Sequence, residues 1–234
     1  MSALLEITGL TKNYQALRPL RIAQLRVLPG EVVVIGGIDG LAAETLVHLI
    51  TGAALPDAGD VTLLGQNTKE ITDGGAWLES LDAVGMVSAR GVLIEAFSVL
   101  QNIAMSYTLD VDPIDPRVVP QAGELARSVG IDQSLFDAPA GKVPPDMQMR
   151  VHLAKSIALG PKLLIAEHPS ATLPRELVPA FGADLMKTAQ SRNLALLAVT
   201  ADDTLAKAIG GRRLELVPAS GELRAPGLFK KLFG

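Results

Sequence analysis

The chain has 234 residues, of which 48% are hydrophobic and 3% aromatic, with no cysteine and a formal net charge of −4. This length suits one large α/β domain, or a core with a small subdomain, built mainly from Leu, Val, Ile and Ala. The lack of cysteine excludes disulfides and thiol chemistry and fits a reducing compartment. Basic residues are scattered, which argues against broad nucleic-acid binding, because affinity for the phosphate backbone comes from clustered Lys and Arg.

Membrane-spanning segments and metal sites are also disfavoured by the residue pattern. No apolar run reaches the about 20 residues that a membrane-spanning helix needs, and we expect no secretory signal. The three histidines, His48, His152 and His168, are far apart in the sequence, and none has a partner at metal-ligand spacing. We therefore predict no metal site of the histidine type.

The first part of the chain alternates predicted strands with turns. Strands are expected at residues 4–10, 20–27, 32–35, 60–64 and 84–87. The unbroken β-branched run Val32 to Ile35 is typical of a strand buried on both faces of a parallel sheet. A helical pattern follows a glycine-rich turn and ends at Gly52. A second, shorter helix is predicted over 77–81.

The character changes from Ser88 onward. Helices are predicted at 100–107 and 121–129, separated by a stretch rich in Pro and Asp, and this pattern suggests an inserted helical subdomain. Further helices are expected at 151–159, 177–189 and 201–209, alternating with buried strands at 163–166 and 194–200 and a final strand at 213–217. Buried strands that alternate with helices indicate a parallel sheet covered on both faces, to which the first segments add an antiparallel part.

The stretch VVVIGGIDGLAAETL, from Val32 to Leu46, has the strand, glycine loop and helix order of a phosphate-binding loop. Compared with G-x-x-x-x-G-K-[ST], Ala43 stands at the lysine and Glu44 at the hydroxyl residue. The candidate nucleotide-binding positions of the loop are Gly37, Gly40, Ala42, Ala43, Glu44 and Thr45. The loop keeps its frame and lacks the side chains that touch a nucleotide.

A second block, RVHLAKSIALGPKLLIAEHPSATLP, completes a nearly full-length resemblance to the ATP-binding subunit of ABC transporters. Framework positions of that family are met at Gly30, Gly37, Thr51, Gly52, Pro56, Gly59, Gly65, Arg150, Val151, Ala154, Pro161 and Pro169. Tyr14 lies where the family places an aromatic side chain that stacks on adenine. The resemblance implies an α/β fold with a P-loop (RecA-like) ABC ATPase core, an N-terminal antiparallel β subdomain and an inserted α-helical subdomain. The implied boundaries are 1–87 and 157–234 for the core and 88–156 for the helical insertion.

The departures from the family pattern fall on the positions with direct chemical roles. By resemblance, the phosphate-contacting lysine corresponds to Ala43, the Mg²⁺-binding hydroxyl to Glu44, and the Mg²⁺-orienting aspartate and catalytic glutamate to Glu167 and His168. The remaining replacements fall on Ala89 for the glutamine of the water network, on 143–147 for the signature L-S-G-G-Q, on Pro174 for the closing aspartate of the D-loop, and on Ala201 for the switch histidine.

These losses bear directly on the chemistry of phosphoryl transfer, which depends on positioning and charge stabilisation. Ala43 supplies no positive charge, and Glu44 adds a negative charge that would repel a triphosphate by an energy on the order of several kcal/mol at a partly buried site. We therefore expect ATP and Mg²⁺ to bind weakly or not at all. An alternative is that Glu44 and Glu167 together hold a hard divalent cation, with His168 as a general base.

Each of these residues also has a purely structural interpretation. Glu44 in the first turn of a helix is favoured by the helix dipole without any ligand. His168 can be a structural remnant, and Tyr14 can simply cover a loop. The Val143-Pro-Pro-Asp stretch is explained as a rigid helix entry, because proline is favoured in the first turn.

Two segments suggest contacts with other molecules. Ser88 to Asn102 carries several apolar residues, and by resemblance this segment faces the membrane subunit, so a docking surface is expected there. The tail Gly227 to Gly234, GLFKKLFG, is basic and amphipathic, and it either touches a membrane surface or forms an ordinary chain terminus.

Three functions remain open at this point. The first is a catalytically impaired ABC subunit with a structural or regulatory role, partnered by an integral membrane permease and a second ABC subunit, in the cytoplasm at the inner face of the membrane. The second is an active ATPase that uses Glu44, Glu167 and His168 as non-standard residues. The third is a binding module outside transport that uses the same fold.

Overall fold

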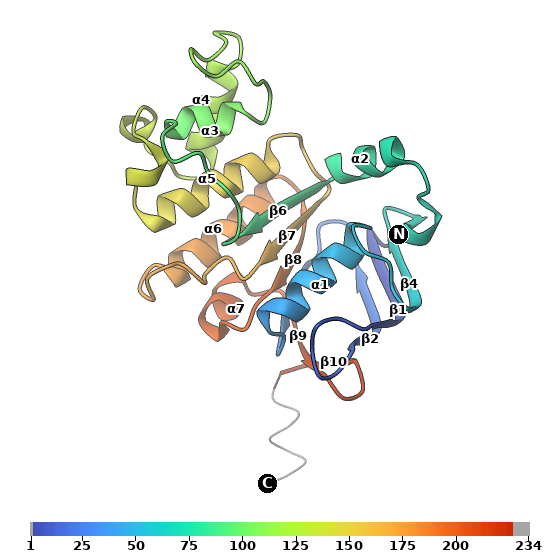
Figure 1. Ribbon diagram of the computed structural model, residues 1–234. Helices are drawn as coiled ribbons and strands as arrows, with labels where there is room; N and C mark the ends of the chain where they lie inside the picture. Colours follow the sequence, from blue (N-terminus) through green and yellow to red (C-terminus); the bar gives the residue numbers. More distant parts are fainter. Residues whose placement is uncertain (1, 227–234) are drawn as a thin grey trace.

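The N-terminal strands form an antiparallel sheet in the computed structural model, which describes residues 2–226 (Figure 1). Its strand order is β2-β1-β4-β5. The strands are β1 (Leu5–Lys12), β2 (Leu20–Val27), β4 (Ala58–Leu63) and β5 (Gln66–Asn67). The apolar residues that alternate along β2 are buried and the residues between them are exposed, which confirms the predicted antiparallel part.

A second sheet has six strands in the order β10-β9-β3-β8-β7-β6. The strands are β3 (Val32–Gly36), β6 (Val84–Ser88), β7 (Leu163–Glu167), β8 (Ala195–Val199), β9 (Arg212–Val217) and β10 (Glu222–Arg224). Strands β3, β6, β7, β8 and β9 run parallel to one another. Every residue of β7 and β8 is buried, as predicted. The expectation that β9 is the final strand is wrong, because β10 pairs antiparallel with it.

Seven α-helices connect the strands of the described residues. They are α1 (Gly40–Ile50), α2 (Gly74–Asp82), α3 (Val99–Ala104), α4 (Val119–Ser128), α5 (Pro145–Ile157), α6 (Val178–Ser191) and α7 (Asp203–Ile209). Short 3₁₀ turns lie at Thr68–Glu70, Gln133–Leu135 and Ala140–Lys142. The helix predicted from residue 151 begins six residues earlier, because Pro144 is its N-cap and Pro145 fits its first turn.

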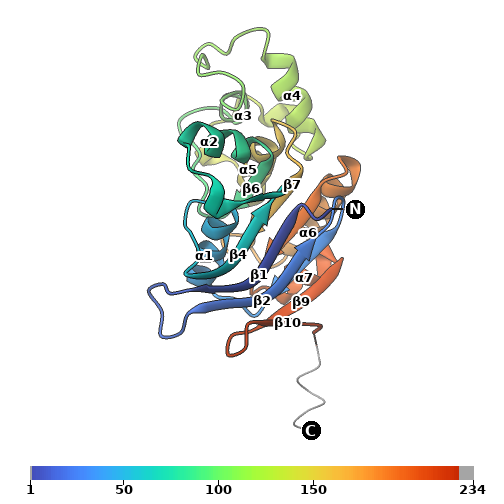
Figure 2. The ribbon, with the colours of Figure 1, turned by 90° about the vertical axis from the view of Figure 1, so that its right-hand side faces the viewer.

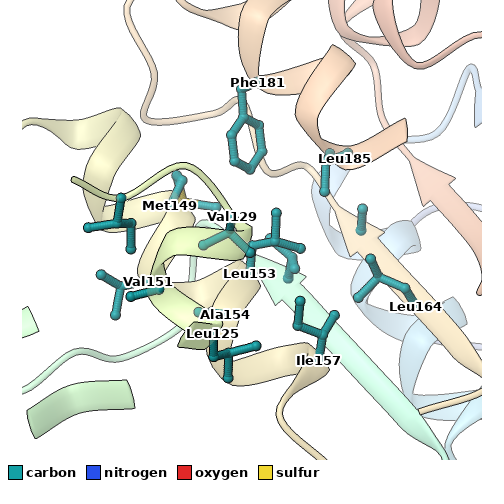
Figure 3. Packing of buried hydrophobic residues seen from close by; sticks show 14 of the residues in the cluster. Leu125, Val129, Met149, Val151, Leu153, Ala154, Ile157, Leu164, Phe181 and Leu185 are labelled. Carbon is teal, nitrogen blue, oxygen red and sulfur yellow. The ribbon is translucent and has the colours of Figure 1, made fainter. Parts of the chain in front are cut away.

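Two hydrophobic clusters lie on opposite faces of the six-stranded sheet. Along β3, Val33 and Ile35 point into the cluster made with α1 and the antiparallel sheet, whereas Val34 points into the other. The second cluster contains buried residues of α3 to α7, and Figure 3 shows side chains from α4, α5, α6 and β7 meeting there. Figure 2 shows the antiparallel strands beside the six-stranded sheet, with α3 and α4 at the far end from β10. The division of the chain at residues 88 and 156 stays a prediction.

The parallel strands bring their carboxyl ends to one edge of the sheet. Ser88 of β6 pairs with Glu167 of β7, which in turn pairs with Val199 of β8, and Val199 also pairs with Ile35 of β3. Open α/β sheets bind ligands at this edge. Across residues 2–226, no helix has both the length and the apolar character to span a bilayer.

Candidate functional site

The glycine loop joins β3 to α1, and Asp39 of the loop binds two backbone N–H groups at the start of that helix. Asp39 is the N-cap of α1, and its Oδ1 accepts a hydrogen bond of 2.8 Å from the backbone N–H of Ala42. The N–H of Ala43 donates to the carbonyl oxygen of Asp39 at 2.9 Å. A helix N-terminus attracts anions because such N–H groups point toward them. In this loop the carboxylate of Asp39 takes the place of a bound anion at the N–H of Ala42.

Glycine is needed at only one of the two candidate loop positions. Gly37 has φ +70°, and a Cβ there would lie 3.0 Å from the carbonyl oxygen of Leu216, so close approach of β9 requires glycine. Gly40 opens α1, and nothing lies within 4 Å of the position that its Cβ would take.

The positions of the missing phosphate contacts are filled by buried methyl groups and a hydroxyl that binds its own helix. Ala42 and Ala43 belong to the cluster between α1 and the sheets, and Ala43 is 0% exposed. The hydroxyl of Thr45 donates to the carbonyl oxygen of Leu41 at 2.8 Å. None of these three side chains brings a positive charge to the loop.

Arg90 bridges the two carboxylates that sequence reasoning singled out. Its Nη2 donates to both Oε atoms of Glu167 at 2.7 Å, and its Nη1 forms an ion pair with Glu44. The Glu167 side chain is 3% exposed, whereas Glu44 lies nearer the solvent. The hydrogen bond to Glu167 raises the pKa of Arg90 above its ordinary value, against the lowering effect of burial, and Glu44 adds to the rise. We call Glu44, Arg90 and Glu167 the charge triad.

The charge triad bears on two expectations about Glu44. Glu44 is the fifth residue of α1 and lies outside its first turn, so the helix dipole does not explain it. The alternative of a divalent cation between Glu44 and Glu167 stays a prediction, and it would require the guanidinium of Arg90, which pairs with both carboxylates, to leave. In the described part of the chain, no group of three or more His, Asp or Glu side chains is arranged to hold a metal ion. These residues therefore do not fit the Mg²⁺ that the resemblance implies.

His168 follows β7 and lies apart from the charge triad. Its backbone has φ +39°, and its Nδ1 is 3.5 Å from the backbone N of Ala201. Its Nε2 is buried without a hydrogen-bond partner. No hydrogen bond or ion pair within residues 2–226 joins His168 to Glu44 or Arg90. Glu167 and His168 are thus neighbours in sequence whose side chains have different partners: Glu167 binds Arg90, and His168 lies next to Ala201.

A cavity of 540 Å³ opens beside His168. Its lining includes Ser170, Arg175 and Asp202. The hydroxyl of Ser170 donates to Asp202 at 3.0 Å, and the other oxygen of Asp202 caps α7 by accepting from two backbone N–H groups. Burial works to raise the pKa of Asp202, but the hydrogen bonds from Ser170 and from α7, together with Arg175, outweigh it and hold the pKa below its ordinary value.

Tyr14 is brought to the glycine loop from the turn after β1. It is half-buried against the cluster under α1 and lines a cavity of 70 Å³ together with Gly37, Asp39 and Ala42. This volume is far below the about 300 Å³ at which ordinary ligand pockets begin. Burial raises the pKa of the Tyr14 phenol, and the charge of Asp39 adds to the rise.

The segment from Ser88 to Asn102 borders a separate cavity of 360 Å³. Residues of this segment and of α5 line it, including Gly91, Val92, Leu93, Glu95, Gln148, Met149 and His152. Val92 is 80% exposed, whereas Val99 and Leu100 are buried, so only the first part of the segment offers an apolar surface. Burial lowers the pKa of His152, and the positive charge of Lys155 lowers it further. The tail at 227–234 lies outside the described residues.

Two residues of the site were not predicted from the sequence. Asp39 could have been found, because an aspartate directly before a helical pattern is a strong N-cap signal. Arg90 gave a weaker signal, a single cation next to Ala89 in an otherwise apolar stretch. Its role depends on the long side chain reaching both Glu44 and Glu167 across the edge of the sheet.

Comparison with known proteins places this geometry in a family. A sequence model of the family described as ABC transporter matches residues 20–171, more than half of the chain. The chain belongs to the ABC transporter family. Two relatives bear the name lipoprotein-releasing system ATP-binding protein LolD. The protein from Geobacter metallireducens is 28% identical over 93% of this chain and 97% of its own, and that from Acinetobacter baylyi is 30% identical over 78% and 80%.

A solved structure confirms the fold of this ABC family chain. The dimeric structure of MJ0796, a bacterial ABC transporter cassette, superposes with a TM-score of 0.75 at 20% identity and covers 94% of this chain and 96% of its own. The predicted fold, a P-loop ABC ATPase core with an antiparallel β part, is therefore correct. The charge triad lies where β6 and β7 end, and the correspondence of Glu44 and Glu167 to the family's metal-binding positions stays a prediction.

Proposed function

We propose that this chain is an ATP-binding-subunit-like component of an ABC transport complex that has a structural or regulatory role and does not sustain ATP hydrolysis. The observation that carries the proposal is the charge triad, in which Arg90 pairs with the two residues that correspond by resemblance to the family's Mg²⁺-binding positions. The buried methyl group of Ala43 and the Asp39 cap support it, since one removes the phosphate-binding charge and the other fills an anion-binding N–H.

The partner side of the proposal rests on the 360 Å³ cavity. Its rim carries the exposed Val92, and the resemblance places the membrane subunit against this segment. We propose that an integral membrane permease subunit docks there, at the inner face of the membrane, and that a second ABC subunit pairs with this chain. Relatives named for a lipoprotein-releasing system make such a system the first place to look for the permease.

Nucleotide titration of the purified full chain tests the catalytic part. We expect ATP to show no saturation up to about 1 mM with or without Mg²⁺, a range that corresponds to less than about 4 kcal/mol of binding. Phosphate release should stay at background. The LolD protein from Geobacter metallireducens, named as an ATP-binding protein, is run in parallel as the positive control for ATP binding.

The same experiment separates this proposal from an active ATPase. Micromolar affinity with steady phosphate release would overturn the proposal, and loss of that release in His168→Ala would assign the activity to the non-standard residues. Affinity capture from detergent-solubilised membranes tests the partner. Recovery of soluble partners without any membrane subunit would favour a binding module outside transport.

A further inference from the structure

Arg90 lies where the nucleotide-binding edge meets the rim of the 360 Å³ cavity. It is the second residue after β6, and the residues on either side of it, Ala89 and Gly91, both line that cavity. Its guanidinium pairs with Glu44 of α1 and Glu167 of β7. One residue therefore joins the cavity rim to both elements of the phosphate-binding edge.

The backbone around Arg90 is fixed by local hydrogen bonds at both ends of the rim. The N–H of Arg90 donates to the hydroxyl of Ser88 at 3.1 Å, and the N–H of Gly91 donates to the Ser88 carbonyl oxygen at 3.0 Å. At the far end, the fully buried Asn102 side chain binds both the N–H and the carbonyl oxygen of Ile94. Between these two ends, the Arg90 side chain adds contacts from the segment to α1 and β7.

The charges explain why Arg90 stays in place without a ligand. Glu167 is a buried carboxylate, and a buried charge requires a partner. A guanidinium that donates two bonds to one carboxylate and pairs with a second is a strong, directional arrangement. In a nucleotide-dependent site the counter-charge would arrive and leave with the metal. In this chain the counter-charge is the guanidinium of Arg90, which is part of the protein itself.

We propose that Arg90 is a built-in counter-cation that holds the cavity rim, residues 88–94, in one position whether or not nucleotide is present. The inference rests on the proposed function in one respect only: it takes the 360 Å³ cavity to be the site where the membrane partner docks. A rim that is already ordered binds its partner at a lower entropic cost. A nucleotide that does not change the charge triad cannot shift the rim, because a ligand shifts an equilibrium only by its differential affinity for the two states.

Hydrogen exchange of the purified full chain tests the proposal without needing the partner. In the natural chain, amide exchange over 88–95 should be the same with and without millimolar ATP and Mg²⁺. In Arg90→Ala the same amides should exchange about tenfold faster or more, because local opening is easier. Arg90→Lys should fall between them, since a single ammonium nitrogen has no second nitrogen to pair with Glu44 while it binds Glu167. Arg175→Ala, which removes an exposed arginine beside Asp202, is the matched control and should exchange like the natural chain.

Divalent cations provide a second readout on the same variants. Removing the guanidinium leaves Glu44 and Glu167 facing each other, so Mn²⁺ should raise the melting temperature of Arg90→Ala and leave that of the natural chain unchanged. Adding Glu44→Gln to Arg90→Ala should abolish the effect. If Arg90→Ala does not fold without metal, its recovery by Mn²⁺ supports the proposal, and failure to recover counts against it.

Two results would overturn the inference. One is exchange over 88–95 that changes with nucleotide in the natural chain, and the other is exchange in Arg90→Ala that equals that of the natural chain. The first outcome would also show that nucleotide binds and so bears on the proposed function, whereas the second, measured on Arg90→Ala without nucleotide, is independent of it. Steady phosphate release would overturn the function, whereas constant exchange together with no membrane partner would leave the Arg90 inference standing and overturn the docking role.

Discussion

Asp39 stabilises the start of α1 with its own carboxylate, so the helix needs no external anion. Replacing an N-cap aspartate by alanine typically costs about 1 kcal/mol of unfolding free energy. We expect Asp39→Ala to lose about that amount, and Asp39→Ser to lose only a few tenths, because serine also caps helices. Urea unfolding of the three chains measures the difference. Equal stability of the alanine and serine variants would show that the hydrogen bond to Ala42 does not stabilise the helix.

Asp202 gives the stability of the molecule a dependence on pH. Its folded-state pKa is lowered, so its contribution is present above the unfolded pKa of about 3.9 and is lost as the pH falls through the folded value. The stability advantage of the natural chain over Asp202→Asn should thus be constant from about pH 7 to 5 and narrow below about pH 4. Urea unfolding at a series of pH values measures it, with Asp203→Asn, on the exposed neighbour, as the control. An advantage that widens on acidification would contradict the assignment.

At the level of single residues, part of the site could be predicted from the sequence. Glu167 ends a buried strand and Glu44 follows the glycine loop, so their meeting at one edge of the sheet follows from the parallel topology. The cation between them was not predictable in the same way. The direction of an arginine side chain depends on which partners the tertiary structure brings within its reach, and Arg90 lies 77 residues from Glu167 in sequence.

The elements themselves were largely predictable because their signals are local. Unbroken apolar runs gave β3, β7 and β8, and alternation gave β2. β10 was missed because Glu222–Arg224 is short and has no apolar period, and its pairing with β9 alone makes it a strand. The helix predicted to reach residue 107 ends at Ala104, and sequence patterns are least reliable at such boundaries.

The contact between β1 and β4 depends on one glycine that has no room for a side chain. A Cβ on Gly59 would lie 2.3 Å from the carbonyl carbon and oxygen of Gly9, and its φ is +76°. Gly9 has φ +60° but an open position, with its nearest neighbour at 4.0 Å. Gly9→Ala should therefore cost about 1–2 kcal/mol for the left-handed backbone alone. Gly59→Ala should cost clearly more, because the strands must also move apart.

Thermal or urea unfolding of both alanine variants tests this pair. A difference in unfolding free energy between Gly59→Ala and Gly9→Ala of about 2 kcal/mol or more is expected from the added overlap. Equal losses would mean that the two strands adjust without cost at their irregular register between Thr8 and Thr11.

At the scale of the whole molecule, the cluster formed by α3 to α7 runs without a break onto the six-stranded sheet. Residues of the predicted helical insertion, such as Leu125 and Leu153, share it with Phe181 and Leu185 of α6 (Figure 3). Elements that share one core unfold together. We therefore expect residues 88–156 to unfold together with the rest of the chain.

Urea unfolding followed by two probes provides that measurement. Trp77, the single tryptophan, lies in α2 outside the predicted insertion and donates its Nε1–H to Thr51, so its fluorescence reports on the region around α1. Far-ultraviolet circular dichroism reports mainly on the helices, including α3, α4 and α5. We expect the two transitions to coincide. An earlier loss of helical signal, with fluorescence unchanged, would show that residues 88–156 unfold separately.

The buried methyl group of Ala43 has a consequence for how such a chain changes over evolutionary time. Ala43→Lys alone would carry an ammonium group toward a cluster of apolar side chains, which is costly without a paired anion. The nearby anions are already committed, Asp39 to the cap of α1 and Glu44 to Arg90. A lysine at this position therefore requires a second substitution that supplies a free anion, and a single mutation reaches it only with a loss of stability.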